Sequence, residues 1–152
     1  MSGFSGKYYY AMDEKGRLMI PAPFRDVVFT SYKSAPGLMV ANSAFDSCLN
    51  VYPLEEWQKL EDKVRLLPRS DKSVRYFLRK VIASAVETSL DKQGRILVPA
   101  AHRQDSGLDG EVVLVGQVEM IEVWSKSAWA QEMDSSRVDR DAIEASLSRY
   151  GI

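Results

Sequence analysis

Two short segments place an acidic and a basic side chain at the same spacing in two parts of the chain. Residues 13–25 read DEKGRLMIPAPFR, and residues 91–103 read DKQGRILVPAAHR. In both, an aspartate precedes an arginine by four residues and a glycine stands directly before the arginine. A guanidinium group carries a planar fork of donors that binds phosphate oxygens, or the O6/N7 edge of guanine, in bidentate fashion. The repeated pair therefore predicts recognition of a polyanion.

The residues around each arginine predict a tight turn that would hold its side chain in place. Gly16 and Gly94 can adopt the positive φ that closes a type I turn with a bulge between two strands. Asp13 and Asp91 stand where a carboxylate accepts hydrogen bonds from the amides of the turn, and where it can pair with the arginine four residues later. The sequence therefore predicts that each turn aims one arginine.

The alternative is an ion pair that only stabilises a hairpin. An exposed pair of this kind contributes roughly 0.2–1 kcal/mol to folding stability. Duplication of the whole arrangement favours binding, because a staple needs no particular neighbours. Two turns related by pseudo-twofold symmetry match a polyanion with its own repeat, which is duplex DNA. The candidate DNA-contacting residues are those of the turns, the lysines beside them and one arginine four positions after each proline: Asp13, Lys15, Gly16, Arg17, Arg25, Asp91, Lys92, Gly94, Arg95 and Arg103. For Arg25 and Arg103, a salt bridge on a helix surface is an equal alternative to a phosphate contact.

The repeat continues beyond the turns and predicts two related halves. LNVYPLEEW at 49–57 aligns with IEVWSKSAW at 121–129, so the offset falls from 78 to 72 residues. The first copy then carries about six extra residues, which we place around 31–37. Short runs rich in Val, Ile and aromatic residues predict eight strands, with one hairpin at each turn. The expected strands are 7–12, 17–21, 37–43, 48–53, 87–90, 95–99, 111–117 and 120–124.

Helical patterns flank these strands. Pro21 and Pro99 are preset for the first turn of a short helix. Apolar residues at helical spacing predict further helices over 54–67, 71–83 and 136–149. The expected organisation is a first repeat at 7–54, a helical connection at 55–83, a second repeat at 84–127 and a C-terminal helical segment at 128–152.

Composition excludes some classes of function. The chain has 152 residues and a net charge of −1, but residues 1–103 hold 16 Lys and Arg against 11 Asp and Glu, while residues 104–152 hold 4 against 10. The basic part could face an anion, although charges that merely alternate over a solvated surface are the alternative. A single Cys48 and a single His102 disfavour disulfide and zinc chemistry. We expect no cofactor and no metal.

Neither catalysis nor membrane insertion is expected. His102 has no accompanying nucleophile signature, and the chain has no glycine-rich phosphate loop. No uncharged run approaches the roughly 20 apolar residues of a membrane span, and the first residues lack a signal peptide. We therefore expect a cytoplasmic protein that is not an enzyme.

The two motifs resemble the Asp-x-x-x-Arg turns of the AbrB-like swapped-hairpin fold. Two copies in one chain of this length, each followed by a strand pair and a tryptophan helix, resemble the MraZ family of transcriptional regulators. The resemblance covers nearly the whole chain, including GEVVLVGQVEMIEVW at 110–124. It implies a mainly β fold with flanking helices (α+β): a duplicated swapped-hairpin β-barrel, pseudo-dimeric within one chain.

The resemblance also implies a function. Members assemble into homo-oligomeric rings, bind G-rich direct repeats in the promoter of the division and cell-wall gene cluster, and regulate their own operon, typically as repressors. By position, the turns 13–17 and 91–95 would contact double-stranded DNA, with Arg17 and Arg95 reading it and the aspartates organising the turn. The expected partners are promoter DNA and further copies of the chain, at the nucleoid, with no membrane and no small-molecule substrate. Gln93 stands where Lys15 stands in the first turn, so we expect the halves to bind unequally.

Subunit contacts and a rival function remain open at this point. The helices at 54–67 and 71–83, with Trp57 and Trp129, are candidates for subunit contacts, and plain core packing is their alternative. The rival function is an antitoxin-like interaction protein that binds DNA weakly while an extended tail occupies a partner. The helical pattern at 136–149 disfavours such a tail.

Overall fold

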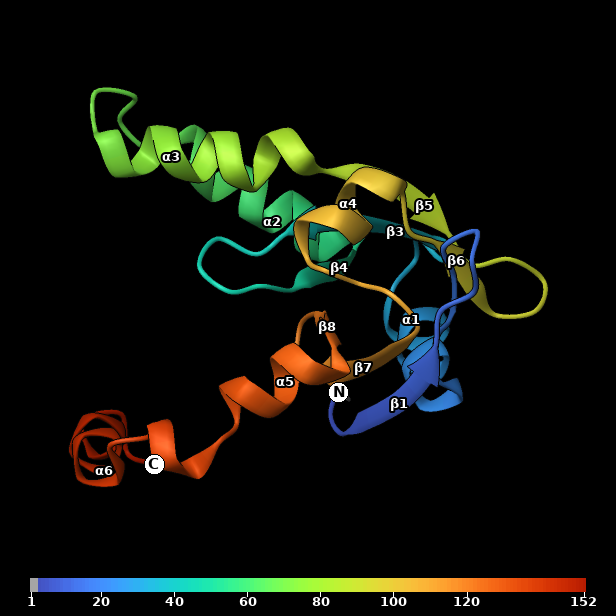
Figure 1. Ribbon diagram of the computed structural model, residues 1–152. Helices are drawn as coiled ribbons and strands as arrows, with labels where there is room; N and C mark the ends of the chain where they lie inside the picture. The colour runs from blue at the N-terminus through green and yellow to red at the C-terminus, as the bar shows by residue number, and fades with distance from the viewer. Residues whose placement is uncertain (1–2) are drawn as a thin grey trace.

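The structure is a computed structural model that describes residues 3–152, and strands of both halves of the chain form its sheets (Figure 1). The strands are β1 (Lys7–Ala11), β2 (Arg17–Met19), β3 (Gly37–Asn42), β4 (Leu49–Pro53), β5 (Val86–Ser89), β6 (Arg95–Leu97), β7 (Glu111–Gly116) and β8 (Ile121–Ser125). The helices are α1 (Ala22–Ser31), α2 (Leu54–Arg65), α3 (Lys72–Lys80), α4 (Ala100–Asp105), α5 (Lys126–Glu132) and α6 (Arg140–Ser148), with 3₁₀ turns η1 (Ile82–Ser84) and η2 (Ser135–Arg137).

The sheet order reveals the internal symmetry that the repeat predicts. One sheet runs β1-β7-β8-β4-β3-β5, and a separate ribbon pairs β2 with β6. Equivalent strands of the two halves stand at mirrored places in this order, and β4 and β8 meet at its centre, where Asn50 lies opposite Glu122. These two residues are equivalent in the repeat. A pseudo-twofold axis therefore passes between them, and the fold is mainly β with helices, as the sequence predicts.

The predicted local hairpins are wrong in their pairing. The chain does reverse at each glycine turn, but β1 forms its ladder with β7 and β2 forms its ladder with β6. In the same way β5 pairs with β3 of the first half. Two strands that flank one turn thus enter different sheets, because each half completes its pairing with the other half. The two halves therefore form a single intertwined structure.

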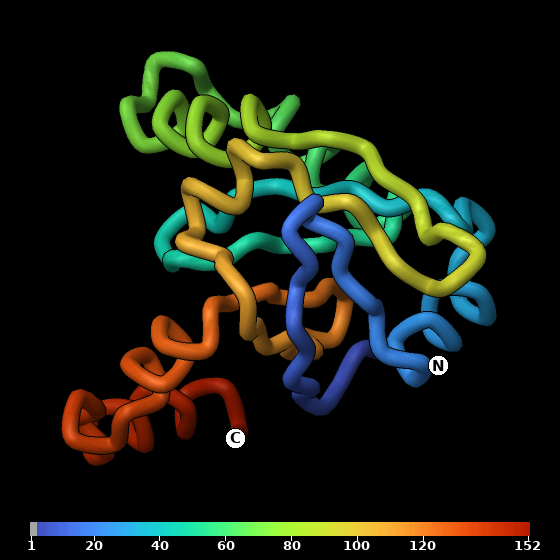
Figure 2. Tube along the Cα trace, turned by 45° about the vertical axis from the view of Figure 1, so that its right-hand side comes forward, coloured from blue at the N-terminus to red at the C-terminus, as the bar shows by residue number. Residues whose placement is uncertain are grey.

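The expected barrel is not a continuous one. β1 and β5 are the edges of the six-stranded sheet, and within residues 3–152 no ladder joins them to each other. The ribbon of β2 and β6 instead lies across the open side of the sheet, as the blue and yellow segments show in Figure 2.

The core fills the space between the sheet and the ribbon. Leu18 of β2 and Ile96 of β6 are 0% and 1% exposed, and they meet valines and leucines of the facing sheet. Phe24 of α1 closes one end and packs edge-on against the rings of Phe4 and Tyr8. Because the core packs against the inner face of the ribbon, the ribbon is a rigid support for the side chains on its outer face.

The six extra residues of the first half lie elsewhere than around 31–37. Helix α1 has 10 residues and its equivalent α4 has 6, which lowers the offset between the halves from 78 to 74. Segment 32–36 has the same length as its equivalent 106–110, and the offset then falls to 72 because the β3–β4 loop is longer than the β7–β8 loop. A longer helix and a longer loop therefore replace the expected insertion.

The predicted helices are present with shifted ends. The pattern at 54–67 becomes α2, that at 71–83 becomes α3 followed by η1, and that at 136–149 becomes η2 and α6. In both views α5, η2 and α6 lead away from the sheet (Figures 1 and 2). Among the helices of residues 3–152, none combines the length and the apolar character that crossing a membrane would require.

Candidate nucleic-acid interface

The first arginine turn is organised by the carboxylate of Asp13. Its Oδ1 accepts the backbone N–H groups of Lys15 at 3.0 Å and Arg17 at 2.9 Å, and its Oδ2 accepts Nε of Arg17 at 2.5 Å. The N–H of Gly16 donates to the carbonyl of Asp13 at 3.0 Å, and Gly16 has a φ of 85°. One carboxylate thus fixes both the backbone of the turn and the direction of the guanidinium.

The second turn repeats this geometry. Asp91 Oδ1 accepts the N–H groups of Gln93 and Arg95, both at 2.9 Å, and Oδ2 accepts Nε of Arg95 at 3.1 Å. Gly94, with a φ of 82°, donates to the Asp91 carbonyl at 3.0 Å. Because equivalent atoms make equivalent contacts in both halves, the predicted pairing of aspartate with arginine is confirmed at both turns.

These contacts favour the ionised carboxylates. The backbone N–H of Arg17 is the largest cause that lowers the pKa of Asp13 below its ordinary value, and the Arg17 side chain and the Lys15 amide add to it. The N–H of Arg95 is likewise the largest cause that lowers the pKa of Asp91. Both aspartates are consequently charged at neutral pH, and each keeps its ion pair.

Arg17 and Arg95 lie on the same face of the β2–β6 ribbon. Arg17 pairs with Leu97 and Met19 pairs with Arg95, while Leu18 pairs with Ile96 between them. Successive side chains of a strand point to opposite faces and directly paired residues share one face. Since Leu18 and Ile96 point into the core, both arginines point outward.

The guanidinium groups remain accessible. The side chains of Arg17 and Arg95 are 42% and 29% exposed. In the described chain, residues 3–152, the hydrogen bonds of these two guanidinium groups involve Nε alone, so both Nη atoms are available to a ligand. Lys15, Lys92 and Gln93 are exposed on the turns beside them.

A shallow groove joins the two arginines. It has a volume of about 510 Å³ and is lined by Arg17, Arg95, Asp91, Leu97 and residues 87–89 of the edge strand β5. Met19 and Leu97 share the outward face with the arginines, and sequence reasoning did not single them out. The alternation of side chains along each strand is the signal that could have found them.

Arg25 and Arg103 belong to α1 and α4 and not to the β2–β6 ribbon. Each is half-buried on α1 or α4, and each side chain reaches across to the turn of the other half. Arg25 contacts Gly94, and Arg103 contacts Gly16. The salt bridge that was the alternative to a phosphate contact is absent for both arginines within residues 3–152, and their guanidinium groups donate to backbone carbonyls.

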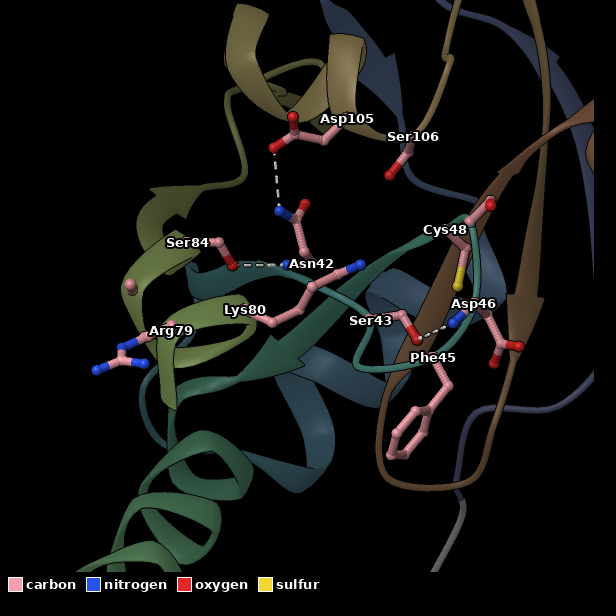
Figure 3. A pocket seen from close by; sticks show the side chains of 12 residues that line it. Asn42, Ser43, Phe45, Asp46, Cys48, Arg79, Lys80, Ser84, Asp105 and Ser106 are labelled. Atoms are coloured by element: carbon pink, nitrogen blue, oxygen red, sulfur yellow. Dashed lines mark hydrogen bonds between the residues drawn. The ribbon is translucent and has the colours of Figure 1, made fainter. Parts of the chain in front are cut away.

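His102 has a structural position. Its side chain is buried, and its Nε2–H donates to the carbonyl oxygen of Ser84 at 2.6 Å. The hydroxyl of Ser84 in turn accepts the N–H of Asn42, whose side chain donates to Asp105 at 3.0 Å (Figure 3). Asn42, Ser84 and Asp105 line a cavity of about 480 Å³ between the β3–β4 loop, η1 and α4. His102 therefore holds Ser84 within the second half, and Asn42 of the first half joins the two halves through Ser84 and Asp105.

The tryptophans of the two repeats pack within the chain. Trp57 is 3% exposed and lies against Tyr52, with ring centroids 5.3 Å apart. Trp129 lies against Trp124 at 5.7 Å. Core packing, the alternative reading, thus accounts for Trp57, which cannot also contact another subunit.

Comparison with known proteins shows the family of the chain. The family model described as "MraZ protein, putative antitoxin-like" matches it twice, over residues 4–80 and 81–149. Proteins named "Transcriptional regulator MraZ" match over nearly their whole length: that of Desulfitobacterium hafniense strain Y51 is 44% identical over 152 residues, and that of Acetivibrio thermocellus is 39% identical over 149 residues. That of Clostridium beijerinckii is 38% identical over 149 residues. Each match covers 98% of this chain and 99% of the relative.

Proposed function

The chain belongs to the MraZ family, and from this premise we propose that it is a transcriptional regulator that binds duplex DNA through its two arginine turns. The observation that carries the proposal is the shared outward face of Arg17 and Arg95. Each guanidinium is aimed by an aspartate and keeps both Nη atoms for a ligand. Phosphate oxygens and the O6/N7 edge of guanine are the groups that such a fork recognises.

The proposed target is the chain's own promoter. We propose that the protein binds direct repeats there and represses the division and cell-wall gene cluster that includes its own gene. The repeats 7–54 and 84–127 would supply the DNA contacts. The segments 55–83 and 128–152 would supply the contacts between subunits. The residues that touch DNA would be those of the turns 13–17 and 91–95. The site of action is the nucleoid in the cytoplasm.

Assembly into a ring is the second part of the proposal. One chain offers only two arms and has a net charge of −1, so that a single contact with DNA would be weak. A ring that engages several repeats at once gains affinity through effective concentration, often by about 10²–10⁴. Exposed apolar side chains just after α2, on α3 and on α6 support such contacts between subunits: Leu66, Leu67, Tyr76, Ile143 and Leu147.

A binding titration tests this proposal. Promoter fragments with one, two and three repeats are titrated by fluorescence anisotropy at several salt concentrations. We expect affinity to rise steeply with each added repeat, and to fall steeply with salt because phosphate contacts release counterions. Equal affinity for all three fragments would contradict the ring, and a flat salt response would contradict the phosphate contacts.

An antitoxin-like interaction protein is the second candidate, and the description of the matching family favours considering it. In that case the C-terminal segment would bind a partner protein while the arginine turns bind DNA weakly. Gel filtration and limited proteolysis separate the two. A large assembly with an uncut C-terminal segment supports the regulator, and a small oligomer with a rapidly cleaved segment supports the antitoxin.

A further inference from the structure

Each arginine turn is closed from outside by a residue of the opposite half. A methyl group on Gly16 would lie 2.8 Å from Nε of Arg103 and 2.5 Å from the carbonyl oxygen of Val98. A methyl group on Gly94 would lie 2.7 Å from Nη1 and 2.8 Å from Cδ of Arg25. These glycines thus serve two purposes: they adopt a positive φ, and they let an arginine from the other half approach the backbone of the turn.

Hydrogen bonds connect Arg103 to the first turn. The N–H of Val98 donates to the carbonyl of Gly16 at 2.8 Å, and Nε of Arg103 donates to the carbonyl of Val98 at 3.2 Å. Nη1 of Arg103 also donates to the carbonyl of Glu14 at 3.4 Å. Arg103 therefore contacts the first turn directly at Glu14 and indirectly through Val98, which is hydrogen-bonded to Gly16.

The equivalent connection runs from Arg25 to the second turn. The N–H of Ile20 donates to the carbonyl of Gly94 at 2.9 Å, and Nη1 of Arg25 donates to the carbonyl of Ile20 at 2.7 Å. The same Nη1 lies 3.4 Å from the sulfur of Met19. Since both arginines are half-buried in these contacts, their donors are already directed at the protein.

We propose that Arg25 and Arg103 are positioning residues, each of which holds the DNA-contacting turn of the opposite half, and that neither acts by contacting phosphate. This rests on the proposed function for the role of the turns. Arg103 acts through the turn that carries Arg17, and Arg25 acts through the turn that carries Arg95. Each half thus adds support to a turn that the other half's own aspartate organises, which gives a physical reason for two repeats in one chain.

Hydrogen exchange read by mass spectrometry tests the crossed contacts without DNA. In Arg103→Ala, we expect peptides that cover 13–17 to exchange roughly 5–30-fold faster, because backbone contacts are lost, while peptides over 91–95 keep the exchange of the unmodified chain. Arg25→Ala should give the opposite pattern. Faster exchange in both turns, or in neither, would overturn the proposal. If either alanine variant fails to fold, Arg→Lys at the same position takes its place, because lysine keeps the charge but lacks the planar fork.

Binding measurements with promoter DNA then separate positioning from phosphate contact. If Arg103 contacts phosphate, Arg103→Lys should keep most of the affinity for promoter DNA. If Arg103 positions the turn, lysine cannot replace it and the affinity should fall. We further expect Arg103→Lys to weaken binding in the unmodified chain but by less than about twofold in an Arg17→Ala background, since residues that act together are not additive. In an Arg95→Ala background its full effect should remain. Equal effects in both backgrounds would contradict the crossed coupling.

The two measurements also keep this proposal apart from the proposed function. Should the unmodified chain fail to bind promoter DNA, the proposed function is wrong, and the exchange pattern still decides whether Arg25 and Arg103 hold the turns. If the chain binds DNA but the arginine variants do not speed hydrogen exchange selectively in the turn of the opposite half, only the positioning role is wrong.

Discussion

Arg17 and Arg95 stand diagonally across the β2–β6 ribbon, each at the first position of its strand and on the same outward face. Diagonal neighbours in a sheet are about 7–8 Å apart. The two strands run antiparallel, so the pseudo-twofold axis of the chain relates one arginine to the other. Duplex DNA has antiparallel strands with local twofold symmetry, and a symmetric pair of guanidinium groups fits it better than two unrelated cations would.

Replacement of Asp13 by Asn distinguishes the orientation of the Arg17 guanidinium from the net charge of the chain as the cause of DNA affinity. Asn keeps an oxygen for the backbone amides, but its amide group cannot accept Nε of Arg17, so the guanidinium is released. The substitution makes the net charge more positive by one, and simple attraction to DNA would then increase affinity. We expect the opposite, a loss of about tenfold, because a well-placed arginine contact is worth roughly 1–3 kcal/mol. Fluorescence anisotropy with promoter DNA measures it.

Asp26→Asn is the matched control for this experiment. Asp26 is exposed on α1 and its replacement changes the net charge by the same amount. Its affinity for the promoter fragment should equal or slightly exceed that of the unmodified chain. A gain in affinity for Asp13→Asn as large as that of the control would refute the organising role of the carboxylate.

Acid should remove the contribution of the turn carboxylates to stability. Because the pKa values of Asp13 and Asp91 are lowered in the folded chain, their contribution is fully present above about pH 4, the ordinary range of aspartate, and is lost as pH falls through the lowered values. The double variant Asp13→Asn and Asp91→Asn lacks it at every pH. Urea unfolding between pH 6 and pH 3 should therefore show a stability difference that shrinks below pH 4. A difference that stays constant down to pH 3 would argue against these ion pairs.

Gln93→Lys should strengthen the weaker half. The backbone N–H groups of Gln93 and Lys15 make equivalent contacts with the turn aspartates, at 2.9 and 3.0 Å, and both side chains are exposed. One added phosphate contact steepens the slope of log affinity against log salt by about 0.9. Lys15→Gln should flatten that slope by a similar amount. Gln131→Lys, which adds the same charge far from the turns, is the control and should leave the slope unchanged.

Local sequence patterns were sufficient for the turns. The aspartate, glycine and arginine in each motif interact within five residues, so spacing alone predicted the carboxylate contacts, the positive φ and the ion pair. The amphipathic stripe at 54–67 predicted α2 for the same reason. These are short-range effects that a sequence states directly.

Pairing between the halves could not be predicted from the residues in the same way. The choice of β7 over β2 as the partner of β1 depends on contacts that are distant in the chain. The resemblance to swapped-hairpin proteins implied such exchange, whereas the hairpin signals around Gly16 and Gly94 predicted local pairing. The contacts of Arg25 and Arg103 arise from this exchange, and for that reason neither alternative considered from sequence described them. Likewise, Trp57 shares a buried cluster with Ala41 and Val81, which are distant from it in the chain.

The double variant Arg17→Ala and Arg95→Ala tests the central claim most directly, by promoter binding measured beside circular dichroism and gel filtration. The account predicts an unchanged spectrum and assembly with a loss of affinity of roughly 100-fold, since two arginine contacts are removed. Lys33→Ala with Lys126→Ala removes the same charge from exposed positions outside the turns and outside the proposed subunit surfaces, and should bind as the unmodified chain does. Unchanged promoter affinity in a folded Arg17→Ala and Arg95→Ala variant would contradict the account.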